Sequence, residues 1–262
     1  MIKNFDENNP IIIVLSGKAG SGKTTVAESI VPKGAIESTT LYGIKWDHIF
    51  NALPLYELST IRRSIRGINE KSRQLFAIHS TLFDIYGNSS IGNIPEYEDF
   101  VRRVYDIQNL PIEPEGVKPR SFLQKAGDIC REGFDDCFAK WSVAKSNSLY
   151  RNYIKSLGED TDPSPFAVLI SDVRFFNEAE AILSQPNGVV VCFDASDETL
   201  NERLMKRDGQ PMSEEHRQHK SEKQVDLVKE IASIVINTDG MNIEKQTMAT
   251  LSSIGILDKA NA

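Results

Sequence analysis

The stretch Ile11–Ile30, which reads IIIVLSGKAGSGKTTVAESI, decides the fold of this chain. The apolar run Ile11–Leu15 predicts a buried strand, and the segment Thr25–Ile30 predicts a helix. Between them, residues Gly17–Thr24 match the pattern G-x-x-x-x-G-K-[ST]. A plain glycine turn is the alternative, but the full pattern between a strand and a helix favours a phosphate-binding loop in an α/β fold.

The residue types of this loop fit the chemistry of a nucleoside triphosphate. Glycines allow backbone N–H groups to turn onto phosphate oxygens, and a helix N-terminus adds partial positive charge there. Lys23 can reach the β- and γ-phosphates, and Thr24 can offer its hydroxyl to Mg²⁺. We therefore expect ATP and Mg²⁺ as cofactors. The residues expected to contact ATP are Gly17, Ala19, Gly20, Ser21, Gly22, Lys23, Thr24 and Thr25.

The composition is that of an ordinary globular enzyme, with 262 residues, 40% apolar and 26% charged. The net charge of −7 argues against non-specific nucleic-acid binding, although a local basic groove stays open. No apolar run approaches the roughly 20 residues of a membrane helix, and the first residues show no signal-peptide pattern. The chain has three cysteines, Cys130, Cys137 and Cys192, and their spacing is not that of metal ligands. We expect a cytoplasmic protein with reduced thiols and no membrane partner.

Further strands are predicted at Gly34–Leu41, Phe166–Asp172, Val189–Phe193 and Ile231–Ile236. The apolar spacing of Ile44–Leu53 predicts a helix. Lys45, near its start, is then a candidate contact to an acceptor phosphate, because ligands bind at the carboxyl ends of strands in open α/β sheets. A solvated helix lysine is the alternative. Residues 55–118 break the strand–helix rhythm and are predicted to form a helical insertion over the acceptor site, whereas 1–54 and 119–262 form the core.

A helical stretch that begins at Arg120 places polar residues on one face. Arg120, Gln124, Gly127 and Arg131 recur at spacings of three or four, so one helix face presents them together. Such a face can hold a phosphate and hydrogen-bond a base edge. A glycine inside a helix costs about 1 kcal/mol relative to alanine, which hints at close packing at Gly127. A helix break is the alternative.

The buried strand Phe166–Asp172 ends in an acid. Asp172 can organise Mg²⁺ and its waters or act as a base. Arg174 follows two residues later and would point to the same side of an extended chain. Glu178 either orients Arg174 or is a first-turn helix acid.

A second candidate site follows the helix that Ser196 begins. This helix carries Arg203 and Arg207 and leads into a polar, irregular stretch, Gly209–Lys223. A lid over transferring phosphate would need such cations on a mobile segment, so residues 207–223 are predicted to form one. An ordinary surface loop is the alternative.

The chain resembles the bacteriophage deoxynucleoside monophosphate kinases, a branch of the P-loop nucleoside monophosphate kinase superfamily. The stretches that carry the resemblance are Gly17–Thr24, Arg120–Gly127, Asp172–Ala179 (DVRFFNEA) and His219–Glu222 (HKSE). It covers roughly the first fifty residues and everything after Arg120. Residues Leu55–Lys118 match nothing in that family.

The resemblance implies transfer of the γ-phosphoryl group of ATP to a deoxynucleoside monophosphate, with Mg²⁺, on a parallel sheet flanked by helices. It implies acceptor contacts from Arg120, Gln124 and Arg174, a place beside the metal for Asp172, and a lid role for Arg203 and Arg207. A P-loop kinase for a hydroxylated base in phage DNA, a nucleotide-binding ATPase without an acceptor, and a homodimer stay open.

Overall fold

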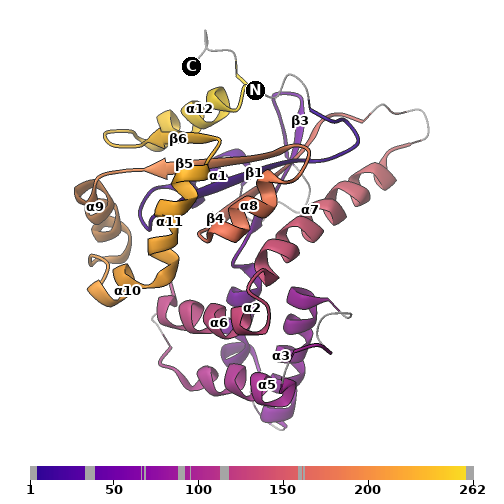
Figure 1. Ribbon diagram of the computed structural model, residues 1–262, viewed down its shortest axis with the longest axis vertical. Helices are drawn as coiled ribbons and strands as arrows, with labels where there is room; N and C mark the ends of the chain where they lie inside the picture. The colour runs from indigo at the N-terminus through magenta and orange to yellow at the C-terminus, as the bar shows by residue number, and fades with distance from the viewer. Residues whose placement is uncertain are drawn as a thin grey trace. The chain divides into compact units, whose positions relative to one another are not determined.

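The computed structural model describes residues 5–32, 39–65, 67, 69–87, 92–94, 96–112, 118–158, 161 and 163–257 (Figure 1). The chain divides into two compact units, which we call the sheet unit (Met1–Asn51 with Ser142–Ala262) and the helical unit (Ala52–Trp141). The elements are β1 (Ile11–Gly17), α1 (Lys23–Ile30), β2 (Thr39–Leu41), β3 (Ile44–Phe50), α2 (Leu53–Ser64), α3 (Glu70–Tyr86), α5 (Tyr97–Asp106), η2 (Ile107–Asn109), α6 (Arg120–Gly133), α7 (Cys137–Ser156), β4 (Phe166–Val173), α8 (Phe176–Leu183), β5 (Gly188–Asp194), α9 (Asp197–Asp208), α10 (Glu214–Gln218), α11 (Lys220–Ile231), β6 (Ile234–Asn237) and α12 (Ile243–Ser253).

The sheet unit is built on a six-stranded sheet in the order β2-β3-β4-β1-β5-β6. The pairs β3–β4, β4–β1, β1–β5 and β5–β6 are parallel, and only β2 runs antiparallel to its neighbour. The loop Gly17–Thr24 follows β1, so it lies at the carboxyl edge of the strands. The predicted α/β class, with a mostly parallel sheet flanked by helices, is confirmed.

Both faces of the central strand are buried because helices cover both sides of the sheet. The side chains of Ile11, Ile13 and Leu15 belong to a core cluster with residues of α1 and α12, such as Val26 and Leu251. The opposite face of the sheet packs against α8 and α11, which Figure 1 shows in front of it. Burial on both faces explains why β1 reads as an uninterrupted apolar run.

The prediction of a helix over Ile44–Leu53 is wrong, because residues Ile44–Phe50 form strand β3. The residues Tyr42 and Gly43 turn the chain with φ of 52° and 73°, which is the left-handed pair that a two-residue hairpin requires. Strand β2 therefore pairs antiparallel with β3, with Leu41 opposite Ile44. Of the strand predicted at 34–41, residues 34–38 lie outside the described part of the chain.

The helical unit has its own apolar core, formed by residues of α2, α3, α5, α6 and the start of α7. Phe122 and Leu82 are fully buried in it. The thiols of Cys130 and Cys137 are also buried there, and among the described residues neither forms a disulfide. The unit is longer than the predicted insertion 55–118, because α6 contributes the apolar residues Phe122, Ala126 and Cys130 to this core.

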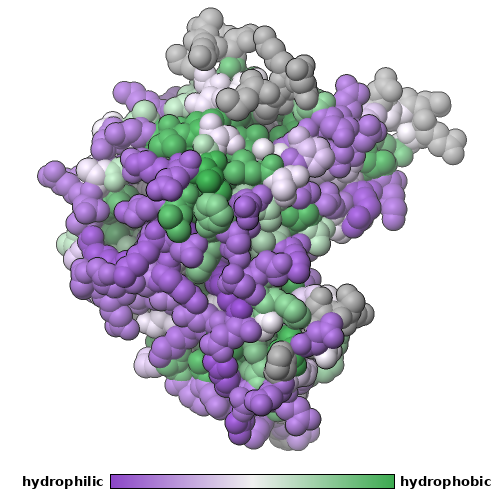
Figure 2. All heavy atoms as spheres, in the orientation of Figure 1, coloured by the Kyte–Doolittle hydropathy of each residue, from purple (hydrophilic) through white to green (hydrophobic). Residues whose placement is uncertain are grey.

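The stretch Gly209–Lys223, predicted as irregular, is mostly helical. Gly209 ends α9 with φ +73°, and the Ser213 hydroxyl accepts a hydrogen bond from His216 N and so begins α10. His219 then begins α11. Figure 2 shows that hydrophilic residues cover the outer face over α9 and α10. Among the described helices, none combines the length and apolarity that crossing a bilayer requires.

Candidate functional site

The loop between β1 and α1 has the backbone that a phosphate cradle requires. Gly20 has φ +88° and Gly22, which caps α1, has φ +95°. A side chain at Gly20 would approach the Leu200 carbonyl oxygen to 2.8 Å, and one at Gly22 would collide with Gln246 Oε1. Both positions therefore favour glycine for conformation, and Gly20 also requires it for space, because the atom that it would meet belongs to the backbone.

Lys23 opens α1, and its side chain is almost completely buried. Its Nζ lies 3.3 Å from the Lys18 carbonyl oxygen and 3.6 Å from Asp172 Oδ1. A buried ammonium group needs such partners, because desolvation without them is costly. The pairing joins the start of α1 to the end of β4, so the loop lysine and the strand-end acid lie together.

Asp172 adopts a backbone conformation that the sequence does not reveal. Leu15 pairs with Ser171 but Ser16 pairs with Val173, so Asp172 is the extra residue of a β-bulge. Its φ is +70°, which is an uncommon value for a residue with a side chain. Strain of this kind is often concentrated at functional sites, where the surrounding structure maintains it.

The bulge changes the reason why Arg174 lies beside Asp172. Side chains do not alternate regularly through a residue at φ +70°. The expectation that Arg174 points to the same side as Asp172 on an extended chain is therefore wrong in its geometry. The two side chains nevertheless meet, with Arg174 Nη2 3.5 Å from Asp172 Oδ1. Lys23, Asp172 and Arg174 thus share one site at the carboxyl edge of β1 and β4.

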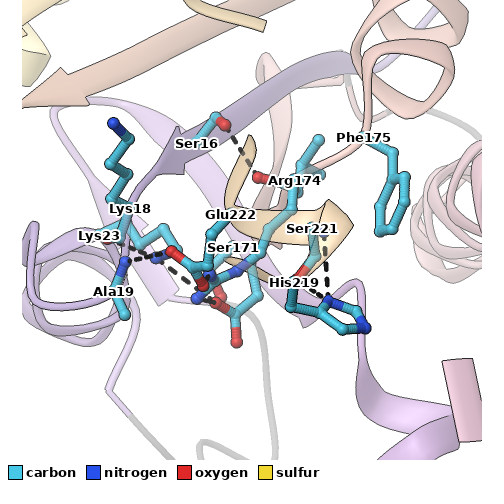
Figure 3. A network of polar contacts seen from close by, with 12 residues as sticks. Ser16, Lys18, Ala19, Lys23, Ser171, Arg174, Phe175, His219, Ser221 and Glu222 are labelled. Carbon is cyan, nitrogen blue, oxygen red and sulfur yellow. Dashed lines mark hydrogen bonds and ion pairs between the residues drawn. The ribbon is translucent and has the colours of Figure 1, made fainter. Parts of the chain in front are cut away.

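A second carboxylate completes this network, and it was not among the predicted site residues (Figure 3). Glu222, in the first turn of α11, accepts a hydrogen bond from the Ala19 backbone N–H at 3.1 Å through Oε2. Its Oε1 accepts from Arg174 Nη1 in an ion pair. The side chains of Arg174 and Glu222 are only 13% and 8% exposed. The available signal was the stretch His219–Glu222, which the family resemblance includes.

Glu178 holds the backbone of the site. Its Oε2 accepts from the N–H groups of Arg174 (3.1 Å) and Phe175 (3.2 Å), the residues just before α8. Glu178 therefore acts as an acid in the first turn of α8. Its backbone contacts fix the chain segment that carries the Arg174 side chain.

The two arginines expected in a lid differ in their surroundings. Arg203 is held by the turn after β6, since its Nη2 lies 2.6 Å from Thr238 O and its Nη1 lies 3.0 Å from Thr238 Oγ1. Burial lowers the pKa of Arg203. Arg207 is half exposed and forms a two-bond pair with Asp208. Arg203 thus anchors α9, and Arg207 lies at its outer end.

Lys45 lies away from the site, contrary to the prediction. It pairs with Phe166, the first residue of β4, and its N–H donates to Pro165 O. The carboxyl end of β4, with Asp172, lies at the opposite edge of the sheet. The prediction failed because it placed Lys45 on a helix after a strand, whereas Lys45 is at the start of a strand.

The polar face predicted for residues 120–131 lies on helix α6 of the helical unit. Arg120 and Gln124 are half-buried. Arg131 folds back on its own helix, with Nη1 3.2 Å from Gly127 O and its guanidinium over the Phe138 ring at 4.7 Å. The group that packs closely at Gly127 is the Arg131 side chain itself.

His48 lies near the carboxyl end of β3, where its Nε2 is 2.9 Å from Ser171 Oγ. Burial lowers the pKa of His48 to about 4, although nearby Asp172 opposes this shift. The imidazole is therefore neutral near pH 7. It adds a hydrogen-bonding group to the sheet edge without adding charge.

The donor types fit Mg²⁺ and a nucleotide. The Thr24 hydroxyl in α1 and the Asp172 carboxylate are hard oxygen donors, which Mg²⁺ prefers. Within the described residues, no three His, Cys, Asp or Glu side chains form a metal cluster. Mg²⁺ usually takes most of its oxygens from phosphates and water, so Thr24 and Asp172 could suffice as its protein donors. Thr25, next along α1, is exposed.

No family model and no curated protein matches the sequence. Among solved structures, the chain is similar to TT1252 from Thermus thermophilus, with 17% identity over 93% of this chain and 97% of that chain and a TM-score of 0.41. It is also similar to a gluconokinase from Sinorhizobium meliloti 1021 (14% identity, 96% and 95%, TM-score 0.41) and to a shikimate kinase from Bacteroides thetaiotaomicron (12%, 92% and 97%, TM-score 0.34). At these values the likeness carries no argument about activity. The α/β assignment therefore rests on the parallel sheet and on the glycine loop that follows β1.

Proposed function

We propose that this protein is an ATP-dependent phosphotransferase that converts a deoxynucleoside monophosphate to the diphosphate. The observation that carries the proposal is the meeting of Lys23, Asp172 and Arg174 beside the glycine loop. Asp172 Oδ1 lies 3.6 Å from Lys23 Nζ and 3.5 Å from Arg174 Nη2. A loop that only held a nucleotide would need Lys23 but not a second cation at the end of β4. Arg174 supplies that second cation, which suits an acceptor phosphate.

Phosphoryl transfer depends mainly on positioning and on stabilisation of charge, so no protein nucleophile is required. An oxygen of the acceptor phosphate attacks the γ-phosphorus, and the bond from that phosphorus to the β–γ bridging oxygen breaks to release ADP. Lys23 stabilises negative charge on the β- and γ-phosphates. Asp172 pairs with both Lys23 and Arg174. With Thr24, it would also hold Mg²⁺, which would neutralise phosphate charge. Arg207 would be the first residue of the proposed lid, 207–223, and Arg203 lies one turn before it in α9.

The choice of a deoxynucleoside monophosphate rests on the family resemblance together with the polar residues of α6. Arg120 and Gln124 occupy one helix, one turn apart, and combine a cation with an amide that can pair with a base edge. Arg131 is engaged with Gly127 and Phe138. In the sheet unit we assign an acceptor contact to Arg174, whereas Arg120 and Gln124 are contacts that the family resemblance implies.

A coupled ADP-release assay with Mg-ATP tests this function against a panel of deoxy- and ribonucleoside monophosphates, including modified pyrimidines. ADP release stimulated by one or a few deoxynucleotides supports the proposal and names the acceptor. Release that no monophosphate changes, but that DNA bearing hydroxylated bases stimulates, would move the activity to DNA. Slow release that responds to neither acceptor would leave an ATPase.

A further inference from the structure

The Glu222 carboxylate occupies a position suited to a phosphate group. Anions bind at a glycine loop through backbone N–H groups, and Glu222 Oε2 takes the N–H of Ala19 in that loop. Its other oxygen takes the Arg174 guanidinium, which is a group that binds phosphate and carboxylate with the same geometry. The carboxylate thus has the two kinds of partner that a nucleotide phosphate would have.

The charges of the site indicate why the Glu222 carboxylate and a nucleotide phosphate would not occupy it together. Lys23 and Arg174 carry two formal positive charges, and Asp172 and Glu222 carry two negative ones, so these four buried side chains sum to zero. A phosphate chain that entered this site would lie against a buried carboxylate in a region of low dielectric, which is unfavourable. Without Glu222 in place, the remaining three side chains sum to one positive charge.

The local structure of α11 explains how Glu222 reaches the loop. The imidazole of His219 accepts a hydrogen bond from Ser221 N and begins the helix, which places Glu222 in the first turn. Gln224 Oε1 accepts from Phe176 N at 3.0 Å and so ties the same turn to α8. The stretch His219–Glu222 thus positions a carboxylate at the glycine loop.

From these contacts we infer that Glu222 is a built-in competitor of nucleotide phosphate, which leaves Ala19 N–H when nucleotide binds and releases Arg174 for the acceptor. This inference rests on the proposed function. It makes Glu222 a positioning residue that acts through Arg174. It also predicts order, because Arg174 becomes available to the acceptor only after the nucleotide has displaced the carboxylate.

The test is a calorimetric titration of ADP, and separately of tripolyphosphate, into the full chain and its variants. Glu222→Gln removes the charge and keeps the shape, so we expect both ligands to bind about tenfold more tightly than to the wild-type chain. Asp226→Asn is the matched control, since Asp226 lies one turn further along α11 and pairs with exposed Lys18. We expect a change of about twofold or less for this variant.

Unchanged or weaker binding by Glu222→Gln would overturn the inference, as would an equal gain in Asp226→Asn, which would indicate a general charge effect. If Glu222→Gln does not fold, Glu222→Asp replaces it, because the shorter side chain cannot span both Ala19 N–H and Arg174. A wild-type chain that binds neither ligand contradicts the proposed function itself. Wild-type binding without a gain in the variant contradicts only the role of Glu222.

Discussion

The sheet unit and the helical unit use their buried side chains differently. In the sheet unit, charged groups such as Lys23, Asp172 and Glu222 are buried beside the glycine loop and pair with one another. In the helical unit, the core is apolar, and the guanidinium of Arg131 lies over the ring of the core residue Phe138. The buried charges of the sheet unit lie where phosphate chemistry is expected. The apolar core of the helical unit mainly stabilises its fold.

Removal of Lys23 is the change expected to affect activity most. Lys23→Ala should lower phosphoryl transfer about 10²–10³-fold, because it removes a preorganised charge from the phosphates. The fold should persist, since Asp172 keeps Arg174 as a partner. The ADP-release assay and circular dichroism measure the two effects. Lys18→Ala in the same loop is the control, and we expect it to stay within about threefold of wild type. Wild-type turnover by Lys23→Ala would remove that residue from the site.

The helical unit is tested through its core. Phe122 is fully buried, so Phe122→Ala should lower the free energy of unfolding by about 3–5 kcal/mol. Phe76 in α3 is 76% exposed, so Phe76→Ala should change the free energy of unfolding by about 0.5 kcal/mol or less. Urea titration measures both. ADP affinity of folded Phe122→Ala should equal that of wild type, and a large loss would show that the two units are coupled.

Arg174→Ala separates acceptor binding from ATP binding. We expect the KM for the acceptor to rise about 10- to 100-fold, because a charge-assisted contact to phosphate is lost, while the KM for ATP changes by about threefold or less. Steady-state kinetics with each substrate varied in turn measures this difference. Arg151→Ala, at an exposed position of α7, is the control and should leave the acceptor KM unchanged. Equal losses for both substrates in Arg174→Ala would place Arg174 outside the acceptor site.

The smallest effect concerns pH. Burial lowers the pKa of His48 from the ordinary 6.5 to about 4, so between these values the unfolded chain binds a proton that the folded chain does not. Stability should therefore fall as pH falls through this window, by about 2 kcal/mol from this group between pH 7 and 4.5. The free energy of unfolding of His48→Gln should therefore fall by about that much less than the value for wild type between pH 7 and 4.5. Urea titrations at the two pH values measure the difference. Parallel losses would show that His48 titrates normally.

The sequence predicted those parts of the site that depend on neighbouring residues. The glycine loop, strand β1 and the acid at the end of β4 all follow from local patterns. Two features do not. The left-handed conformation of Asp172 arises from the pairing of β1 with β4, and the contact between Ala19 and Glu222 joins residues 203 positions apart.

The wrong prediction for Ile44–Leu53 has a similar cause. Its apolar residues fit a helix as well as a strand, and the choice is made by the turn at Tyr42–Gly43 and by pairing with β4. Because of the same pairing, Lys45 lies at the amino end of the strands. Short apolar segments are ambiguous in this way until their partners are known.

The strand order also constrains how the chain is made. Strand β1 pairs only with β4 and β5, and about 150 residues separate its end at Gly17 from the start of β4 at Phe166. At ribosomal rates of about 5–20 residues per second, the apolar run Ile11–Leu15 would wait roughly 7–30 s for its first partner strand. The helical unit is one uninterrupted segment, with core residues between Leu55 and Phe138 that are all synthesised during this interval. During synthesis, strand β1 is therefore a candidate for chaperone protection, whereas the core residues of the helical unit are all made before β4.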